Sequence, residues 1–375
     1  MAVIKSILLV SSAFYPEISP RSFRATELAK EFCRQGHDVV VISKFRNHDY
    51  TDFLKKYPIK FKMWGRSRFP QVPVFNRWPF STLGRWMSRM LLQLLEYPGI
   101  EEMFKVHKML KGEGGYELMV SFAYPYPVHW GTAWTRTKKN RIADTWVADC
   151  GDPYMGAVLD SFRKMFYFSC FEKWFCRRSD YISIPVESAR EAYYSEFHRK
   201  IKVIPQGFSF ELNKRNEFRK TNPVPIFAYA GGFLRGIRDP ELLLSFLTEI
   251  EQPFKFLVFT DKPDLLGRYK LLLNEKLVVS NYIERDKLMD ILFHADFLIN
   301  FDNNTTVHVP SKLIDYAITG RPVLNVDKSF NIEVLRAFIN GDYSKRMQLP
   351  DPEHFHITGI ASAFLGLTNH ANHVR

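Results

Sequence analysis

The sequence predicts an α/β protein with two doubly wound domains, each built around a parallel sheet. The chain has 375 residues, which is long for one core and comfortable for two. Short apolar runs alternate with amphipathic stretches, and this alternation starts again near residue 226. Residues 211–225 are charged, contain proline and lack periodicity, so we expect a linker between domains at residues 1–208 and 209–352.

The first elements predict a βαβ unit. We expect a buried strand at Ser6–Ser12, a helix at Phe23–Arg34 and a second buried strand at Asp38–Ser43. Uninterrupted apolar strands joined by a helix are typical of a parallel sheet. The same pattern argues against a signal peptide at residues 1–13, because a loop and an amphipathic helix follow directly. In that loop Arg21 is a candidate phosphate ligand, or else an ordinary solvated residue.

Later stretches continue the alternation of strands and helices. Further strands are expected at Glu117–Phe122, Phe254–Thr260, Leu277–Ser280 and Asp296–Phe301, and helices at Met155–Cys176, Phe330–Ile339 and Phe355–Leu367. No stretch reaches the 18 or more apolar residues of a membrane span.

The charge balance predicts an anionic partner. The formal net charge is +12 and aromatic residues make up 15% of the chain. Nucleic acid, a phospholipid surface and a phosphorylated substrate all fit such a balance. The four cysteines show neither a C-x-x-C motif nor paired histidine spacing, so neither a zinc site nor a disulfide framework is indicated. A reducing cytosol is therefore the expected compartment.

Residues 61–97 are basic and aromatic. Within them Leu83–Leu95 carries apolar side chains at helical spacing, which predicts a strongly amphipathic helix. Such a stripe usually packs in a core. Tryptophan and arginine beside it are also typical of a helix that lies on an anionic lipid surface. The candidate membrane residues are Arg77, Trp78, Arg85, Trp86 and Arg89.

A short helix is predicted within residues 309–323, because proline and glycine bound it at its two ends. Its N-terminus is a candidate ligand site. Free N–H groups at its start, together with Ser311 and Lys312, attract phosphate. Asp315 lies one turn further on, where it can accept hydrogen bonds from ribose hydroxyls. The alternative is an ordinary capped helix with a solvated aspartate.

A second candidate phosphate site follows the strand that begins at Ile226. Gly231 and Gly232 allow a ligand to approach the backbone closely. Arg235 or Arg238 can pair with a diphosphate through two parallel hydrogen bonds, and we favour Arg238 slightly.

The motif VPSKLIDYAITGRPVL at residues 309–324 resembles the donor-site helix of GT-B glycosyltransferases. The resemblance is to the retaining family 4, whose donor-site motif is roughly P-S-K-hydrophobic-x-E-Y-x-A-x-G-x-P-V. Asp315 replaces the glutamate of that family, and the earlier glutamate of its E-x7-E pattern falls on Val307. Three other stretches are similar to family segments: Asp149–Pro153, Arg177–Pro185 and Ile201–Phe208.

The resemblance implies a GT-B fold, in which two doubly wound Rossmann-like domains face each other across a cleft. The last helix, here within residues 353–375, crosses back onto the first domain in such proteins. The nucleotide base would lie near Asn281 and Tyr282, held by main-chain contacts.

The resemblance also suggests catalytic residues. His129 lies near a loop that often carries a histidine over the donor sugar, although a lone histidine at such a junction is more often structural. Asp149 and Asp152 are candidates for orienting the acceptor hydroxyl or for acting as base. Asp152 has the alternative role of capping the next helix.

The implied activity is retaining transfer of a sugar from a nucleotide-sugar donor to a membrane-associated saccharide or lipid-linked acceptor, in the synthesis of bacterial lipopolysaccharide, O-antigen or capsule. Basic groups and a helix N-terminus can stabilise the leaving diphosphate, so we expect neither a metal nor another cofactor. The basic, aromatic first domain predicts a peripheral location on the anionic inner face of the cytoplasmic membrane. Two alternatives remain, a sugar-nucleotide epimerase on the same fold and a basic nucleic-acid-binding protein, although no RNA or DNA motif is recognisable.

Overall fold

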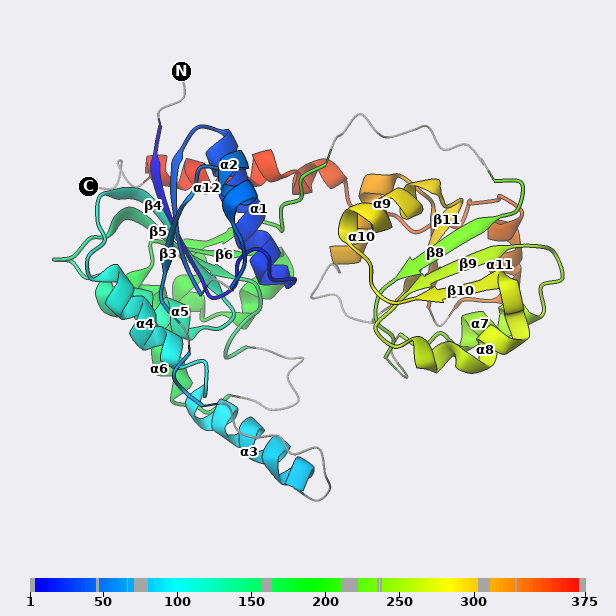
Figure 1. Ribbon diagram of the computed structural model, residues 1–375, viewed down its shortest axis with the longest axis horizontal. Helices are drawn as coiled ribbons and strands as arrows, with labels where there is room; N and C mark the ends of the chain where they lie inside the picture. Colours follow the sequence, from blue (N-terminus) through cyan, green and yellow to red (C-terminus); the bar gives the residue numbers. More distant parts are fainter. Residues whose placement is uncertain are drawn as a thin grey trace. The chain divides into compact units, whose positions relative to one another are not determined.

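The computed structural model describes residues 4–44, 47–65, 67–70, 80–156, 164–210, 222–234, 236, 238–302, 311–327 and 329–370. The chain divides into two compact units, which are both α/β (Figure 1). Unit 1 comprises Met1–Ser209 together with Phe355–Arg375, and unit 2 comprises Phe210–His354. None of the helices in the described ranges is long and apolar enough to cross a lipid bilayer.

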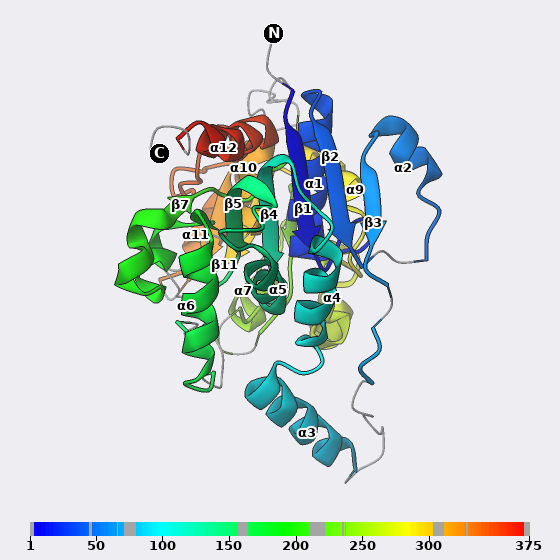
Figure 2. The ribbon, with the colours of Figure 1, turned by 90° about the vertical axis from the view of Figure 1, so that its left-hand side faces the viewer.

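Unit 1 contains a seven-stranded sheet in the order β3-β2-β1-β4-β5-β6-β7, and every neighbouring pair is parallel (Figure 2). The strands are β1 (Ser6–Ser11), β2 (Asp38–Ser43), β3 (Lys60–Met63), β4 (Tyr116–Ala123), β5 (Ala143–Cys150), β6 (Tyr181–Ile184) and β7 (Ile201–Val203). The central strands are buried on both faces, which explains their uninterrupted apolar sequences.

Helices cover both faces of this sheet. The helices of this unit are α1 (Pro20–Arg34), α2 (Thr51–Lys56), α3 (Phe80–Leu95), α4 (Glu101–Leu110), α5 (Pro127–Thr135), α6 (Phe168–Arg178) and α12 (Ile357–His370), with 3-10 turns η1 (Glu187–Ala192) and η2 (Ser195–Lys200). The 3-10 turn η6 (Pro352–Phe355) lies at the boundary with unit 2. Helix α3 extends away from the sheet (Figures 1 and 2). One core cluster joins α1 and α12 to the sheet, and another joins α4, α5 and α6 to it. The C-terminal helix α12 therefore belongs to unit 1.

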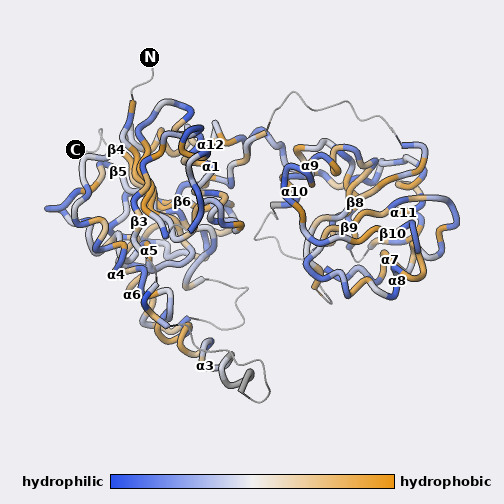
Figure 3. The backbone as a smooth tube through the Cα atoms, viewed as in Figure 1, coloured by the Kyte–Doolittle hydropathy of each residue, from blue (hydrophilic) through white to orange (hydrophobic). Residues whose placement is uncertain are grey.

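Unit 2 contains a five-stranded parallel sheet in the order β10-β9-β8-β11-β12. Its elements are β8 (Ile226–Ala230), α7 (Glu241–Thr248), β9 (Lys255–Phe259), η4 (Pro263–Leu266), α8 (Gly267–Leu273), η5 (Asn274–Lys276), β10 (Leu277–Ser280), α9 (Arg285–His294), β11 (Phe297–Phe301), α10 (Ser311–Thr319), β12 (Val323–Val326) and α11 (Ile332–Ile339). The strands are among the most hydrophobic segments of this unit (Figure 3), and their side chains form its core.

Local capping moves the start of two helices away from the expected positions. Helix α1 begins at Pro20 and not at Phe23, because the Ser19 hydroxyl accepts a hydrogen bond from the Ser22 N–H and proline suits the first turn. Helix α11 begins at Ile332, since Asn331 caps it through the Val334 N–H.

The long helix expected at Met155–Cys176 was wrong in its first part. Residues 153–156 form a turn, residues 157–163 lie outside the described ranges, and helix α6 begins only at Phe168. The backbone at Gly156 lies against Ala192, where an added Cβ would come within 2.1 Å of the carbonyl oxygen. This close contact fixes the turn after β5.

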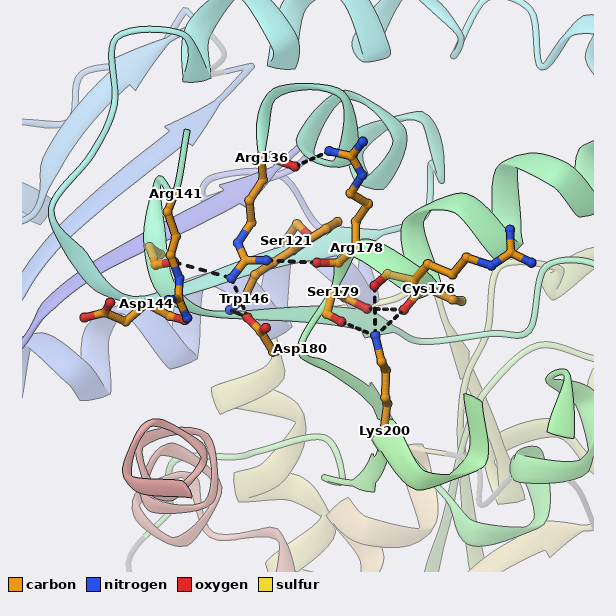
Figure 4. Close-up of polar contacts among 12 residues, drawn as sticks. Ser121, Arg136, Arg141, Asp144, Trp146, Cys176, Arg178, Ser179, Asp180 and Lys200 are labelled. Atoms are coloured by element: carbon orange, nitrogen blue, oxygen red, sulfur yellow. Dashed lines mark hydrogen bonds and ion pairs between the residues drawn. The ribbon is translucent and has the colours of Figure 1, made fainter. Parts of the chain in front are cut away.

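Several basic residues of unit 1 have structural partners near the amino ends of β5 and β6 (Figure 4). Arg136 binds the Asp180 carboxylate at 2.6 Å and donates to the Arg178 carbonyl at 2.9 Å. The Lys200 ammonium donates to the carbonyls of Cys176, Arg177 and Ser179, which end helix α6. These cations are therefore used in folding and do not contribute to an anion-binding surface.

Candidate functional site

The candidate site of unit 2 lies where its strands end. Gly231 follows β8, Asp261 follows β9 and Asn281 follows β10, and in a parallel sheet these carboxyl ends share one edge. Ligands of open α/β sheets bind at this edge. Helix α10 joins it, because the Ala230 N–H at the end of β8 donates to the Tyr316 hydroxyl at 3.1 Å.

The glycine pair lets the backbone turn tightly at the end of β8. Gly231 has a φ of +156°, and an added Cβ would lie 2.8 Å from the Tyr229 hydroxyl. An added Cβ at Gly232 would lie 3.1 Å from the Asp261 carboxylate. The Tyr229 hydroxyl donates to the Gly232 carbonyl at 3.0 Å. A side chain at Gly231 would therefore have to displace the Tyr229 hydroxyl, and one at Gly232 would press against the Asp261 carboxylate.

Two cations, Lys312 and Arg238, meet beside Tyr229. The Lys312 ammonium lies 5.0 Å from the centre of the Tyr229 ring. The Lys312 Nζ and the Arg238 Nε are both buried and have no hydrogen-bond partner among the residues that the structure describes. Burial, and then the Arg238 charge, lower the pKa of Lys312 to about 7. Buried donors of one charge sign without an acceptor are costly, so this arrangement favours an anion.

Asp315 does not lie in solvent. Its Oδ1 accepts hydrogen bonds from the Arg285 Nε at 3.2 Å and Nη2 at 2.6 Å. Burial raises the pKa of Asp315, and the Arg285 charge opposes this rise. The alternative of a solvated aspartate was therefore wrong. Sequence reasoning missed Arg285, because nothing in its local pattern points to a partner 30 residues away.

Two of the other predicted donor-binding residues are described by the structure, and two are described in part or not at all. Tyr282 is half exposed, and burial and the Asp261 carboxylate raise the pKa of its hydroxyl. Asn281 is exposed. The Ser311 backbone begins helix α10, but its side chain lies outside the described part, as does all of Arg235. Asp261 was missed by sequence reasoning, since a single aspartate after a strand gives no signal.

The structure corrects the expectation for His129. The side chain is fully buried in the core of unit 1. Its Nδ1 lies 2.8 Å from the Ser121 hydroxyl and its Nε2 lies 3.6 Å from the Cys150 sulfur. Burial lowers the pKa of this imidazole to about 3, so it stays neutral at ordinary pH. His129 is a packing residue, because no solvent reaches it.

Asp149 likewise has a structural position. Its carboxylate accepts from the Arg24 Nε at 2.6 Å and Nη2 at 2.7 Å and from the Ser183 hydroxyl at 2.6 Å. Arg24 also donates to the carbonyls of Ile204 and Pro205. This buried cluster joins α1, β5, β6 and the segment after β7. Asp149 is therefore occupied by protein partners, which corrects its assignment as an acceptor base.

Asp152 is the exposed carboxylate at the carboxyl end of β5. Its side chain is 65% exposed, and Arg21 at the start of α1 lies 3.9 Å away. Burial lowers the pKa of Arg21, and Asp152 opposes this shift. Residues 153–156 form a turn, so within the described residues Asp152 caps no helix. Asp152 and Arg21 thus remain available to a ligand at this edge of unit 1.

The apolar face of α3 is exposed. Trp86 is 61% exposed and Leu95 is 55% exposed, while Met87 and Met90 are exposed to a smaller degree. We call these four residues the α3 apolar face. These four side chains therefore do not pack in a core, whereas Leu91 and Leu94 of the same stripe are partly buried. Arg89 is exposed as well, whereas Arg77, Trp78 and the Arg85 side chain lie outside the described residues.

Comparison with known proteins identifies the fold. No family model and no curated protein sequence matches the chain. A solved glycosyltransferase from Rickettsia africae ESF-5 is 14% identical, with a TM-score of 0.61 over 98% of each chain. The lipopolysaccharide outer core galactosyltransferase WaaB is 10% identical, with a TM-score of 0.53 over 98% of this chain and 99% of that one. The chain has a GT-B fold.

A third similar structure contains a nucleotide sugar. The HepE protein of Anabaena, solved in complex with UDP-glucose, is 12% identical, with a TM-score of 0.51 over 99% of each chain. The two parallel sheets of the GT-B fold are the architecture that the alternation of strands and helices predicted. At these identities the similarity establishes the fold, and the chemistry rests on the residues of the chain itself.

Proposed function

We propose that this GT-B protein is a glycosyltransferase whose unit 2 binds the diphosphate of a nucleotide-sugar donor. The observation that supports this most is that the buried Lys312 Nζ and Arg238 Nε have no hydrogen-bond acceptor among the described residues. A diphosphate supplies acceptors to both cations. The adjoining start of helix α10 adds the positive end of a helix dipole, and backbone N–H groups at a helix start favour phosphate.

The same residues would stabilise the diphosphate leaving group. When the sugar leaves, negative charge grows on the diphosphate, and fixed positive groups in a buried site lower the energy of that state. Asp315, held by Arg285, is placed to accept hydrogen bonds from the ribose hydroxyls. Retention of anomeric configuration and independence from a divalent ion are proposed from the resemblance to family 4.

We further propose that the acceptor is a lipid-linked or lipopolysaccharide-type saccharide at the cytoplasmic face of the membrane. The α3 apolar face supports this, because it exposes tryptophan, methionine and leucine together with Arg89. A helix of this kind binds anionic lipid through apolar burial and basic residues. One of the similar structures is a lipopolysaccharide galactosyltransferase, which is consistent with this class of acceptor.

A thermal-shift screen of nucleotide sugars tests the donor proposal. A ligand at 100 times its dissociation constant adds about 2.7 kcal/mol of stability and should raise the melting temperature clearly. The Lys312→Met variant should lose this shift. The matched control is Lys255→Met, because Lys255 is exposed at the amino end of β9.

Two results would contradict the proposal. One is an equal shift in the wild type and the Lys312→Met variant, which would place the nucleotide elsewhere. The other is release of an altered free sugar nucleotide without any acceptor, which would indicate an epimerase instead.

A further inference from the structure

Glu172 on α6 is an acidic side chain enclosed in the core of unit 1. The residue is 0% exposed, and neither Oε1 nor Oε2 has a hydrogen-bond partner among the described residues. A charged carboxylate without partners in such surroundings is so unfavourable that the group binds a proton instead. Burial accordingly raises the pKa of Glu172 to about 8, and the backbone of Met155 opposes this rise. At pH 7 the side chain is therefore mainly protonated.

The elements packed around Glu172 present weak acids to it. The titratable groups that interact electrostatically with this carboxyl are Tyr126 on α5, Cys150 on β5, Tyr154 after β5, Cys176 on α6, Tyr193 at the end of η1 and Tyr194 just before η2.

The lysines beside these groups have other partners. Lys164 packs against the Tyr154 ring and pairs with Glu96. Lys173 packs against the Tyr194 ring and pairs with Glu196 at 3.2 Å. Lys200, which interacts with Cys176, donates to the carbonyls that end α6. Within the described ranges, no cation is therefore placed to stabilise an ionised Glu172.

The turn that follows β5 contacts this buried group. The Met155 backbone is close enough to affect the pKa of Glu172, and Gly156 lies against the end of η1 without room for a Cβ. The Tyr126 hydroxyl, one of the neighbours of Glu172, donates to the Asp152 carbonyl. The position of Asp152 therefore depends on the packing around Glu172.

Ionisation of Glu172 would disturb this arrangement, because a buried carboxylate needs hydrogen-bond donors. The Tyr193 hydroxyl has no hydrogen-bond partner among the described residues. The Tyr126 hydroxyl has a single proton, which it gives to the Asp152 carbonyl. The carboxylate would draw this donor away from Asp152 or admit water past the turn. Both changes loosen the turn.

We propose that protonated Glu172 is a positioning residue, which holds the turn at residues 153–156 closed and thereby keeps Asp152 in place at the carboxyl end of β5. Loss of its proton to solvent releases the turn. The movement of the turn follows from the packing around Glu172 alone. Its consequence for catalysis rests on the glycosyltransferase function proposed above.

Hydrogen exchange of the full chain, measured by mass spectrometry, tests the movement of the turn. In the open turn Glu172 regains an ordinary carboxyl pKa, so opening becomes easier as the pH rises. Protection of the amides in residues 152–156, after correction for the intrinsic exchange rate, should fall by up to about tenfold per pH unit between about pH 5 and pH 8. Above that range it should level off.

Two variants complete the exchange experiment. In Glu172→Gln the side chain stays neutral, so protection of the turn should not depend on pH. Asp52→Asn is the matched control, because it replaces a carboxyl by an amide at a side chain of the same unit that is 99% exposed. The control should behave like the wild type. The wild-type pH dependence in Glu172→Gln, or no pH dependence in the wild type, would overturn the proposal.

Thermal unfolding provides a second measurement. The pKa of Glu172 is higher in the folded chain than in the unfolded chain, so its stabilising contribution is complete below about pH 4 and is lost as the pH rises to about 8. The melting temperature of Glu172→Gln should therefore rise relative to the wild type across this range. Glu172→Met, also neutral, gives the same comparison if the amide variant does not fold. A difference that does not change with pH, or failure of both variants to fold, would assign Glu172 to the core alone.

Turnover separates this inference from the function on which it rests. Release of nucleoside diphosphate is measured at saturating donor, which removes the effect of Lys312 on donor affinity. The wild type should lose turnover as the pH rises toward 9, while Glu172→Gln should keep it. Equal pH profiles would overturn the positioning role. If the exchange result holds but no nucleotide sugar binds or reacts, the failure lies in the proposed function and not in the turn.

Discussion

The Arg285 guanidinium donates twice to a single oxygen of Asp315, from Nε at 3.2 Å and from Nη2 at 2.6 Å. The ion pair is partly buried, with side chains 29% and 19% exposed. Arg285 at the start of α9 therefore fixes the orientation of a carboxylate on α10. In the proposed donor site, this contact would leave the second carboxylate oxygen for the ribose.

The first prediction concerns this aspartate. Asp315→Ala should weaken binding of a nucleoside diphosphate and of the bare nucleoside alike, because both carry the ribose. A hydrogen bond to a charged group contributes roughly 1.5 to 3 kcal/mol, which corresponds to about 10- to 150-fold in affinity. Calorimetry with the nucleotide selected in the screen measures this. Unchanged affinity in the folded variant would remove Asp315 from the site.

The second prediction separates phosphate recognition from ribose recognition. Lys312→Met should weaken binding of the diphosphate far more than binding of the nucleoside, since only the diphosphate offers an anion to the two cations. Arg238→Met should behave in the same way. Equal losses for both ligands would instead show a general defect of unit 2. The control is Lys255→Met, at the opposite end of the strands.

The third prediction follows from the pKa of Lys312, which burial lowers to about 7. In the free protein this ammonium is charged below that pH and neutral above it. A bound diphosphate favours the charged form, so binding above pH 7 must take up a proton. Affinity should fall by up to about tenfold per pH unit between about pH 7 and pH 9. Lys312→Met should flatten the profile, and calorimetry in buffers of different ionisation enthalpy should detect the proton.

The fourth prediction concerns the α3 apolar face. Trp86→Glu combined with Met90→Glu should leave the melting temperature nearly unchanged, because both side chains are exposed. The same variant should lose binding to anionic vesicles, and added salt should weaken wild-type binding. Vesicle sedimentation beside a melting curve measures both. Leu271→Glu with Leu272→Glu, exposed residues of unit 2, is the matched control. An unfolded variant together with no wild-type binding to vesicles would contradict the membrane proposal.

The fifth prediction compares two carboxylates at the end of β5. Asp149→Ala should destabilise unit 1 by about 3 to 5 kcal/mol, because it leaves the Arg24 charge buried without its partner. Asp152→Ala should change the free energy of unfolding by no more than about 0.5 kcal/mol, since Asp152 is exposed. Urea unfolding distinguishes the two. Any loss of transfer activity in Asp152→Ala then reflects function and not folding.

Features that depend on neighbouring residues could be predicted before the fold was known. The strand and helix alternation, the helix α10 with its Lys312 and Asp315, and the glycine pair Gly231–Gly232 were all recognisable, because periodicity and turn chemistry act within a few residues. The amphipathic character of α3 was recognisable for the same reason. The sequence did not show whether this apolar face packs in the core or lies in solvent, since both situations produce the same pattern.

Contacts between side chains on distant segments could not be predicted in this way. Arg24 and Asp149 lie 125 residues apart and come together because β1, β4 and β5 are neighbours in the sheet. His129 on α5 is buried for a similar reason, which decides between its catalytic and structural interpretations. Such contacts depend on strand order and on packing between distant segments. Local sequence carries no record of them, and for that reason Arg285 became recognisable as the partner of Asp315 only in the folded chain.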